Sequence, residues 1–119
     1  MGHVYVTVKI SDPLKKRVKN VKMLVDTEAT YPCIPINLAE DLGLKLEFKT
    51  KVILADGREI EAWYATAYIE ILGRGDIMPI RVFNVEEPLI GVLTLEALGL
   101  AVDPVTGEVK STRSFIARA

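Results

Sequence analysis

The sequence predicts a mainly β protein with two short helices. Apolar and polar residues alternate over 4–10 with the period of two that is typical of a half-buried strand. The pair Asp56-Gly57 between two apolar runs is a strong β-hairpin signal. Only 37–43 and 93–99 have the pattern of short helices. The 119 residues can form one core, so we expect a single domain over 1–119.

The N-terminal third is predicted to be a β-hairpin. The strand over 4–10 is broken by Ser11-Asp12-Pro13. Five basic residues follow between positions 15 and 22, which we interpret as a solvated hairpin loop rather than a binding patch. The next strand covers 21–25 and ends at Asp26.

The two predicted helices carry recognisable end signals. In the first, over 37–43, Asn37 is expected to cap the start and Gly43 to take the left-handed conformation at the end. The second, over 93–99, ends at Gly99. Both end in Leu-Gly-Leu, which two helix stops and an internal duplication explain equally well.

The remaining segments are predicted to be strands and turns. Strands over 52–54 and from 60 to 71 flank the turn 55–58, and a turn at 73–76 leads into a strand over 77–83. Pro79 indicates an edge or bulge position in that strand. A short apolar segment covers 89–91, and 102–109 is predicted to close the domain as strand, turn and strand.

Composition excludes several function classes. The net charge of −1 gives no field that would attract nucleic acid or an anionic membrane, and no apolar run approaches the ~20 residues of a membrane-spanning helix. The first residues lack the features of a signal peptide, so we expect a cytoplasmic protein. Glutamine is absent and asparagine scarce, which indicates a thermophilic source.

The segment 24–30 carries the strongest functional signal. An apolar strand leads into Asp26-Thr27-Glu28-Ala29-Thr30, which fits the aspartic peptidase motif Asp-Thr/Ser-Gly-Ala/Ser/Thr except at Glu28. Two carboxylates that share one proton can activate a water for peptide hydrolysis. No other aspartate is followed by Thr or Ser, so the partner of Asp26 would be Asp26 of a second chain in a homodimer. The alternative is that Asp26-Thr27 merely caps a turn.

Most of the chain resembles the retropepsin-like aspartic peptidases, the retroviral-type family, and in particular its prokaryotic members. The resemblance lies in the order of three parts: the Asp26 turn, the segment Leu54-Ala55-Asp56-Gly57-Arg58 at the place of the flap hairpin, and Pro88-Leu89-Ile90-Gly91 before the last helix. It implies a closed β-barrel, an acid-protease half, whose active site lies at a homodimer interface. Chain termini contribute interface strands in that family, and residues 1–7 and 114–119 are apolar enough for this role here.

The same resemblance implies roles for individual residues. Asp26 would be the catalytic carboxylate and Thr27 would hydrogen-bond across the dimer axis beneath it, while Ala29 and Thr30 would buttress the turn. The implied substrate-binding residues are Glu28, Ala29, Ala55, Asp56, Gly57 and Arg58, and the implied substrate is a peptide or protein.

Two departures from the family pattern bear on activity. Val92 and Leu93 follow Gly91, where the family usually has Arg or Met and then Asp or Asn. Glu28 replaces a glycine that permits special backbone geometry and close approach of substrate. In a dimer, two added carboxylates would also disfavour the singly ionised Asp26 pair. We therefore expect weak, altered or absent activity, unless Glu28 turns to solvent or pairs with a base such as Arg58.

Other chemistry has little support in the sequence. Cys33 is the only cysteine, so no internal disulfide forms, and it is expected to be a buried apolar residue. His3 is the only histidine and lies near the terminus, so no His/Cys metal site and no cofactor are expected. Trp63, Tyr64 and Tyr68 either line a peptide cleft or pack within strands.

Three hypotheses follow. The first is a homodimeric aspartic endopeptidase. The second is a catalytically silent dimer of the same fold that binds peptides or a partner protein, and the third is an unrelated small β domain with a chance motif.

Overall fold

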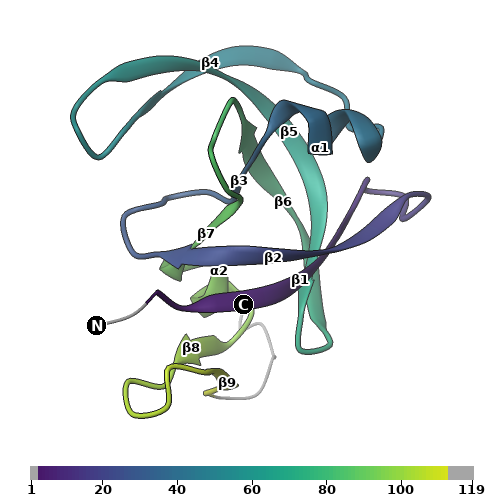
Figure 1. The fold of residues 1–119 in the computed structure, drawn as a ribbon. Coiled ribbons are helices and arrows are strands. Elements are labelled where there is room, and N and C mark those ends of the chain that lie inside the picture. The colour runs from purple at the N-terminus through teal and green to yellow at the C-terminus, as the bar shows by residue number, and fades with distance from the viewer. Residues whose placement is uncertain (1–2, 113–119) are drawn as a thin grey trace, which may run out of the picture.

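The protein is built around a closed β-barrel, which a computed structural model describes for residues 3–112 (Figure 1). Hydrogen bonds join the strands in the order β1-β2-β7-β3-β6-β5-β4, and a further pairing of β1 with β5 closes the barrel. The strands are β1 (Tyr5–Ser11), β2 (Val18–Asp26), β3 (Cys33–Ile34), β4 (Phe48–Ile53), β5 (Glu59–Ile71), β6 (Arg74–Val82) and β7 (Leu89–Gly91). The predicted mainly β class is confirmed.

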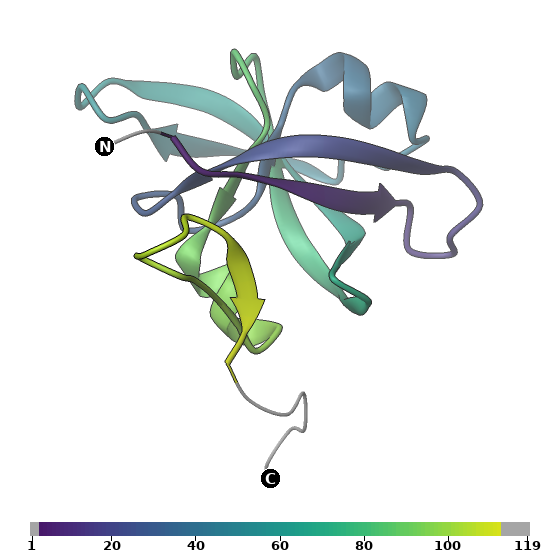
Figure 2. The same cartoon turned by 60° about the horizontal axis from the view of Figure 1, so that its bottom comes forward.

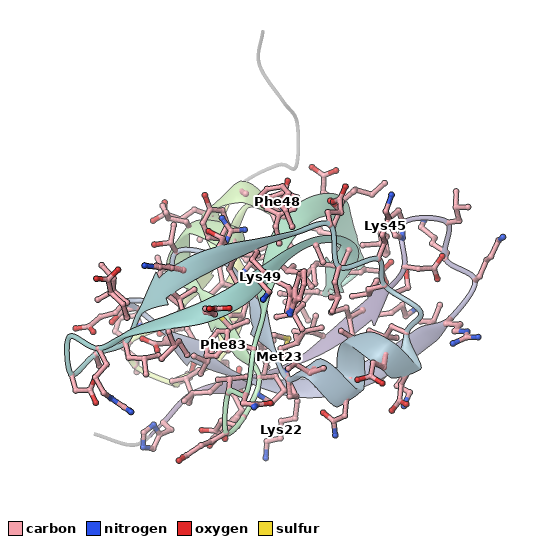
Figure 3. The ribbon with its side chains drawn as sticks, turned by 90° about the horizontal axis from the view of Figure 1, so that it is seen from above. Lys22, Met23, Lys45, Phe48, Lys49 and Phe83 are labelled. Atoms are coloured by element: carbon pink, nitrogen blue, oxygen red, sulfur yellow. The ribbon has the colours of Figure 1, made fainter. Side chains whose placement is uncertain are left out.

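The first hairpin shows why the alternating pattern forms a strand pair. β1 and β2 pair antiparallel over their full overlap, from Tyr5 opposite Leu24 to Ser11 opposite Val18. On β2, Lys22 is exposed and Met23 is fully buried, so successive side chains point to opposite faces (Figure 3). The hairpin therefore buries one face in the barrel and exposes its basic residues.

The short strand β7 is inserted between β2 and β3. It pairs parallel with β2, which places Asp26 opposite Gly91, and antiparallel with β3 at Cys33 and Leu89. Because these paired strands are far apart in the sequence, no pattern of neighbouring residues predicts that they pair. They fix where the turn after β2 lies.

The 13-residue strand β5 connects three neighbours. It pairs with β4, β6 and β1, and its N-terminal half leaves the barrel with β4 as a two-stranded hairpin (Figure 1). Gly57 at the hairpin turn has φ +87°, as the Asp-Gly signal predicts. Pro79 lies in the part of β6 that pairs with β5 but not with β3, in agreement with the expected edge position.

The two helices are α1 (Ile36–Asp41) and α2 (Val92–Ala97). The expected cap at Asn37 is wrong: α1 begins one residue earlier after Pro35, and the Asn37 side chain accepts only the N–H of Leu38. The fixed φ of Pro35 suits a helix start without a side-chain cap. Gly43 and Gly99 both have left-handed φ, as expected of helix stops.

A small second sheet follows α2. Strands β8 (Leu100–Val102) and β9 (Val109–Ser111) pair antiparallel (Figure 2). The predicted order of strand, turn and strand is present, but the predicted range 102–109 covers mainly the turn. The C-terminal residues 114–119, considered above for an interface, lie outside the described residues. No helix in the described range 3–112 is long and apolar enough to cross a membrane.

The interior consists of one main core and a smaller cluster. The main core fills the barrel with fully buried side chains from β1, β5, β6, α1 and α2, among them Ile10, Ile69 and Leu95. The smaller cluster contains Cys33, Ala62 and Phe83, and apolar side chains of the β4–β5 hairpin pack against it. Burial raises the pKa of the Cys33 thiol to about 11, so the thiol stays protonated.

We expect Gly91→Ala to destabilise the protein by about 2–3 kcal/mol, because a Cβ at Gly91 would overlap the carbonyl oxygen of Ala29. The backbone of Gly91 is extended, so this loss would come from overlap and not from φ strain. Urea denaturation measures it. In the control Gly107→Ala, a Cβ meets no atom within 4 Å, and only the left-handed φ of +72° costs about 1 kcal/mol. Equal losses in both variants would show that the contact is not tight.

We expect Cys33 to react slowly with thiol reagents in the folded protein. At pH 8 a pKa of about 11 instead of 9.0 lowers the thiolate fraction about 100-fold, and burial slows access further. Labelling with and without urea, followed by mass spectrometry, measures the ratio. Similar rates in both conditions would show that Cys33 is accessible.

Candidate active site

Asp26 ends β2 at the mouth of a tight turn. Its carboxylate Oδ1 accepts the backbone N–H of Glu28 at 2.9 Å, and its carbonyl accepts the N–H of Ala29 at 3.1 Å. The side chain is half-buried. On the other side of the turn, the Ala29 carbonyl lies so close to Gly91 that only glycine fits there. The pairing of β2 with β7 therefore holds the turn, and with it the carboxylate.

Glu28 fits this turn without backbone strain. Among described non-glycine residues only Lys15 and Leu72 have a positive φ, so the turn does not need glycine for its backbone geometry. The Glu28 amide makes the hydrogen bond to Asp26 that a glycine amide would make. Its side chain is exposed. What Glu28 changes is therefore charge and bulk beside Asp26, not the shape of the turn.

A cleft of about 500 Å³, the Asp26 cleft, opens in front of this turn. One wall is the turn, and the other comes from β4 and the start of the hairpin turn. Its lining residues are Asp26, Glu28, Ala29, Thr30, Tyr31, Cys33, Lys51, Val52, Ile53, Leu54, Ala55, Arg81, Phe83 and Leu89. Of the residues singled out in the sequence, this cleft brings together Asp26, Glu28, Ala29, Thr30, Cys33 and Ala55.

Other sequence candidates lie apart from this cleft. Thr27 is exposed and is absent from its lining, as are Asp56 and Gly57 at the hairpin tip. Arg58 Nε pairs with Asp56 Oδ2 at 2.7 Å, so among the described residues it pairs with Asp56 and not with Glu28. Hydrogen bonds from the backbone and side chain of Arg58 hold the pKa of Asp56 below its usual value.

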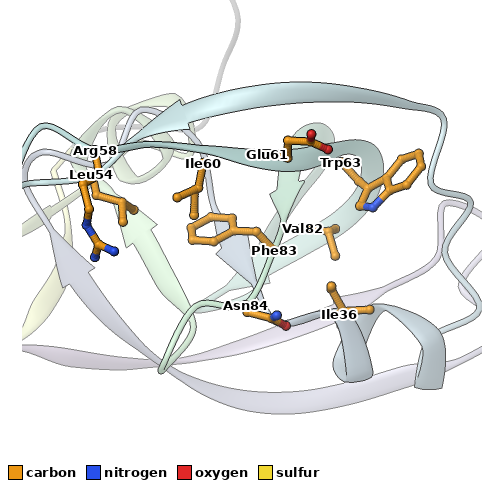
Figure 4. Close-up of a pocket in the computed structure, with 9 residues that line it drawn as sticks. All are labelled: Ile36, Leu54, Arg58, Ile60, Glu61, Trp63, Val82, Phe83 and Asn84. Carbon is orange, nitrogen blue, oxygen red and sulfur yellow. The ribbon is translucent and has the colours of Figure 1, made fainter.

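A second hollow of about 380 Å³, the side pocket, lies on the other side of Leu54 and Phe83, which line both spaces. Figure 4 shows Phe83 near its centre, Trp63 and Ile36 at one end, and Leu54 and Arg58 at the other. Trp63 therefore lines a pocket, whereas Tyr64 stacks on Phe48 with ring centroids 4.6 Å apart. Tyr68 donates its hydroxyl to Glu70 at 2.7 Å.

Several lining residues were missed in the sequence. Lys51 and Arg81 add two positive charges to the Asp26 cleft, and Tyr31 lies beside Arg81. The only local signal was a charged residue, Arg81, between the apolar Ile80 and Val82 in a predicted strand. Nothing local showed that this strand would lie beside the Asp26 turn.

The residues that line the Asp26 cleft include side chains that can take part in acid–base chemistry. In the described chain no group of three or more His, Cys, Asp or Glu side chains could hold a metal ion. Asp26 is one carboxylate on a positioned turn, next to a space that can hold an extended chain. A shared-proton pair would need a second carboxylate opposite it.

No protein-family model matches the chain, and no curated protein matches its sequence. Solved structures do match. EIAV protease in complex with the inhibitor HBY-793 superposes with a TM-score of 0.64 at 17% identity, over 82% of this chain and 89% of that one. The retroviral protease-like domain of Ddi1 from Leishmania major gives 0.63 at 16% identity, over 93% and 89%.

A retropepsin-like aspartic protease from Rickettsia conorii gives a TM-score of 0.64 at 24% identity, over 86% of this chain and 77% of that one. These likenesses cover the barrel and extend over most of each chain. They favour the two hypotheses that assume this fold over the hypothesis of an unrelated β domain. The chain therefore has the retropepsin-like fold of retroviral-type aspartic proteases.

Proposed function

We propose that this protein is an aspartic endopeptidase that works as a homodimer. The observation that carries the proposal is the position of Asp26: it ends β2 in a retropepsin-like fold, on a turn held by Gly91, and lines a cleft. The neighbours with this fold are described as proteases or protease-like domains. Asp26 of each protomer would face the other across a twofold axis.

In this mechanism one Asp26 carboxylate is ionised and the other protonated. The ionised carboxylate takes a proton from a water, which attacks the peptide carbonyl carbon, while the protonated one donates to the carbonyl oxygen. Collapse of the tetrahedral intermediate then breaks the C–N bond and transfers a proton to the leaving amine. The Glu28 N–H, which donates to Asp26 Oδ1, would orient the carboxylate.

The remaining proposed roles concern substrate and dimer contacts. The β4–β5 hairpin supplies Lys51 to Ala55 to the cleft, so it would act as the flap that covers an extended peptide. Asp56, Gly57 and Arg58 at its tip would contact the peptide or the partner's flap after closure. Thr27, exposed beside Asp26, would hydrogen-bond its counterpart at the axis.

Glu28 supports a second candidate function, a silent dimer that binds peptides without cutting them. Glu28 lines the same cleft as Asp26, so a dimer would hold four carboxylates around one axis. The positive charges of Lys51 and Arg81 offset the negative charge of these carboxylates. The lining of each cleft has two acids and two bases, whose formal charges cancel. The peptidase proposal requires that this balance still permits one ionised and one protonated Asp26. The cytoplasmic location and thermophilic source proposed from the sequence have no bearing on this choice.

We expect Asp26→Asn to lower peptide cleavage to below about one thousandth of the native rate, because the general base is lost. The variant is also mixed 1:1 with native protein and left to exchange subunits. Activity should then be about one quarter of that of native protein at the same total concentration, since only native–native dimers carry both carboxylates. Cleavage of a mixed peptide library, read by mass spectrometry, measures both.

The matched control is Asp41→Asn, an exposed carboxylate at the end of α1 that pairs with Lys19. It should leave cleavage unchanged. Cleavage by purified Asp26→Asn protein at the native rate would contradict the peptidase proposal, and half activity in the mixture would contradict a shared dyad.

We expect Glu28→Gly to raise kcat/KM by at least about tenfold, because it removes both charge and bulk beside Asp26. Glu28→Gln removes the charge and keeps the bulk, so comparing the two variants separates these causes. If the native chain cleaves as well as the glycine variant, the silent-dimer function is wrong. If only the glycine variant cleaves, the native chain is not a peptidase.

A further inference from the structure

Arg81 lines the Asp26 cleft, and its neighbours hold its charged side chain in place. Its guanidinium carbon lies 4.0 Å from the ring centroid of Tyr31 and 5.0 Å from that of Tyr64. Tyr64 is its direct partner on β5, and Cys33 is its partner on β3. Arg81 is half-buried, so it is fixed by two strands and two aromatic rings rather than free in solvent.

The hydrogen-bonding capacity of this guanidinium is largely unused. It carries five N–H donors, and the structure gives one bond, from Nη1 to the carbonyl of Ile80 at 3.3 Å. Within residues 3–112 no carboxylate lies within ion-pair distance of it, in contrast to Arg58, which pairs with Asp56 at 2.7 Å. A planar guanidinium with ring contacts and free N–H groups is suited to bidentate binding of a carboxylate.

The position of Arg81 links this capacity to the reacting centre. Arg81, Asp26 and Cys33 line the same cleft. The positive charge of Arg81 and the negative charge of Asp26 both act on the Cys33 thiol, where burial has the larger effect and raises its pKa. A peptide that fills this cleft would therefore meet both Asp26 and Arg81. Lys51 adds a second positive charge on β4, and no described acid pairs with it.

We propose that Arg81, held by Tyr31 and Tyr64, is a specificity-determining residue that binds the carboxylate of an Asp or Glu side chain of the peptide. This inference rests on the proposed peptide-binding cleft, and it names the substrate class: peptides with an acidic side chain within a few residues of the cut bond. Lys51 would strengthen the attraction without fixing its geometry, because an exposed ammonium on a flexible stem is a point charge.

The test uses pairs of peptides that differ only by Glu or Gln at one position. Their ends are acetylated and amidated, so that a side chain supplies the only carboxylate. At one position the native protein should cleave the Glu peptide about 10- to 100-fold better in kcat/KM, because a charge-assisted bond replaces a neutral one. Arg81→Gln should bring this Glu-to-Gln ratio close to 1, whatever its effect on the absolute rate for either peptide. Arg81→Lys should keep part of the ratio, and Arg81→Glu should transfer the preference to a Lys peptide.

The control variant is Arg17→Gln, an exposed arginine in the loop between β1 and β2 that should leave the Glu-to-Gln ratio unchanged. The ratio within one variant is independent of the fraction of folded protein, so partial unfolding cannot mimic the result. Raising the salt concentration should lower the ratio.

Binding of the same peptides to the Asp26→Asn variant separates this inference from the proposed function. A Glu preference in binding without any cleavage by native protein supports the acidic subsite and contradicts the peptidase. Cleavage with equal rates for Glu and Gln at every position supports the peptidase and overturns the acidic subsite. Equal binding of both peptides, or no binding of either, also overturns it.

Discussion

The site depends on the parallel pairing of β2 with β7. This pairing places Asp26 opposite Gly91 and brings the Ala29 carbonyl against a position that has no room for a Cβ. Backbone packing against Gly91 thus holds the turn, while the Glu28 amide holds the Asp26 carboxylate by a hydrogen bond. A catalytic group gains from such support because its position is set before substrate binds.

The same arrangement explains how the turn accepts Glu28. The family glycine could serve backbone conformation, close approach of substrate, or both. Glu28 has no left-handed φ and keeps the amide hydrogen bond, so of these two uses only the close approach of a substrate would be lost. The consequence is electrostatic and steric rather than structural. Arg81 and Lys51, which line the same cleft, then matter, since they offset the charge that Glu28 adds.

The sequence predicted most elements and only part of the site. Strand alternation, the Asp56-Gly57 turn and the helix stops at Gly43 and Gly99 act over a few residues, so they could be identified directly. The cap at Asn37 failed because Pro35 starts α1 earlier. The tip residues Asp56 and Gly57 were grouped with the cleft by sequence order, whereas the cleft is lined by β4 and Ala55.

The sequence by itself determined the strands, the turns and the motif that carries Asp26, because each depends on neighbouring residues. Only the tertiary structure decided the closure of β1 on β5, the insertion of β7 beside β2 and the meeting of Arg81 with Tyr31 and Tyr64. These contacts join residues far apart in the chain, and their stability comes from burying a shared core rather than from local preference. The Asp26 carboxylate could therefore be recognised in the sequence, and the two basic residues that line the same cleft could not.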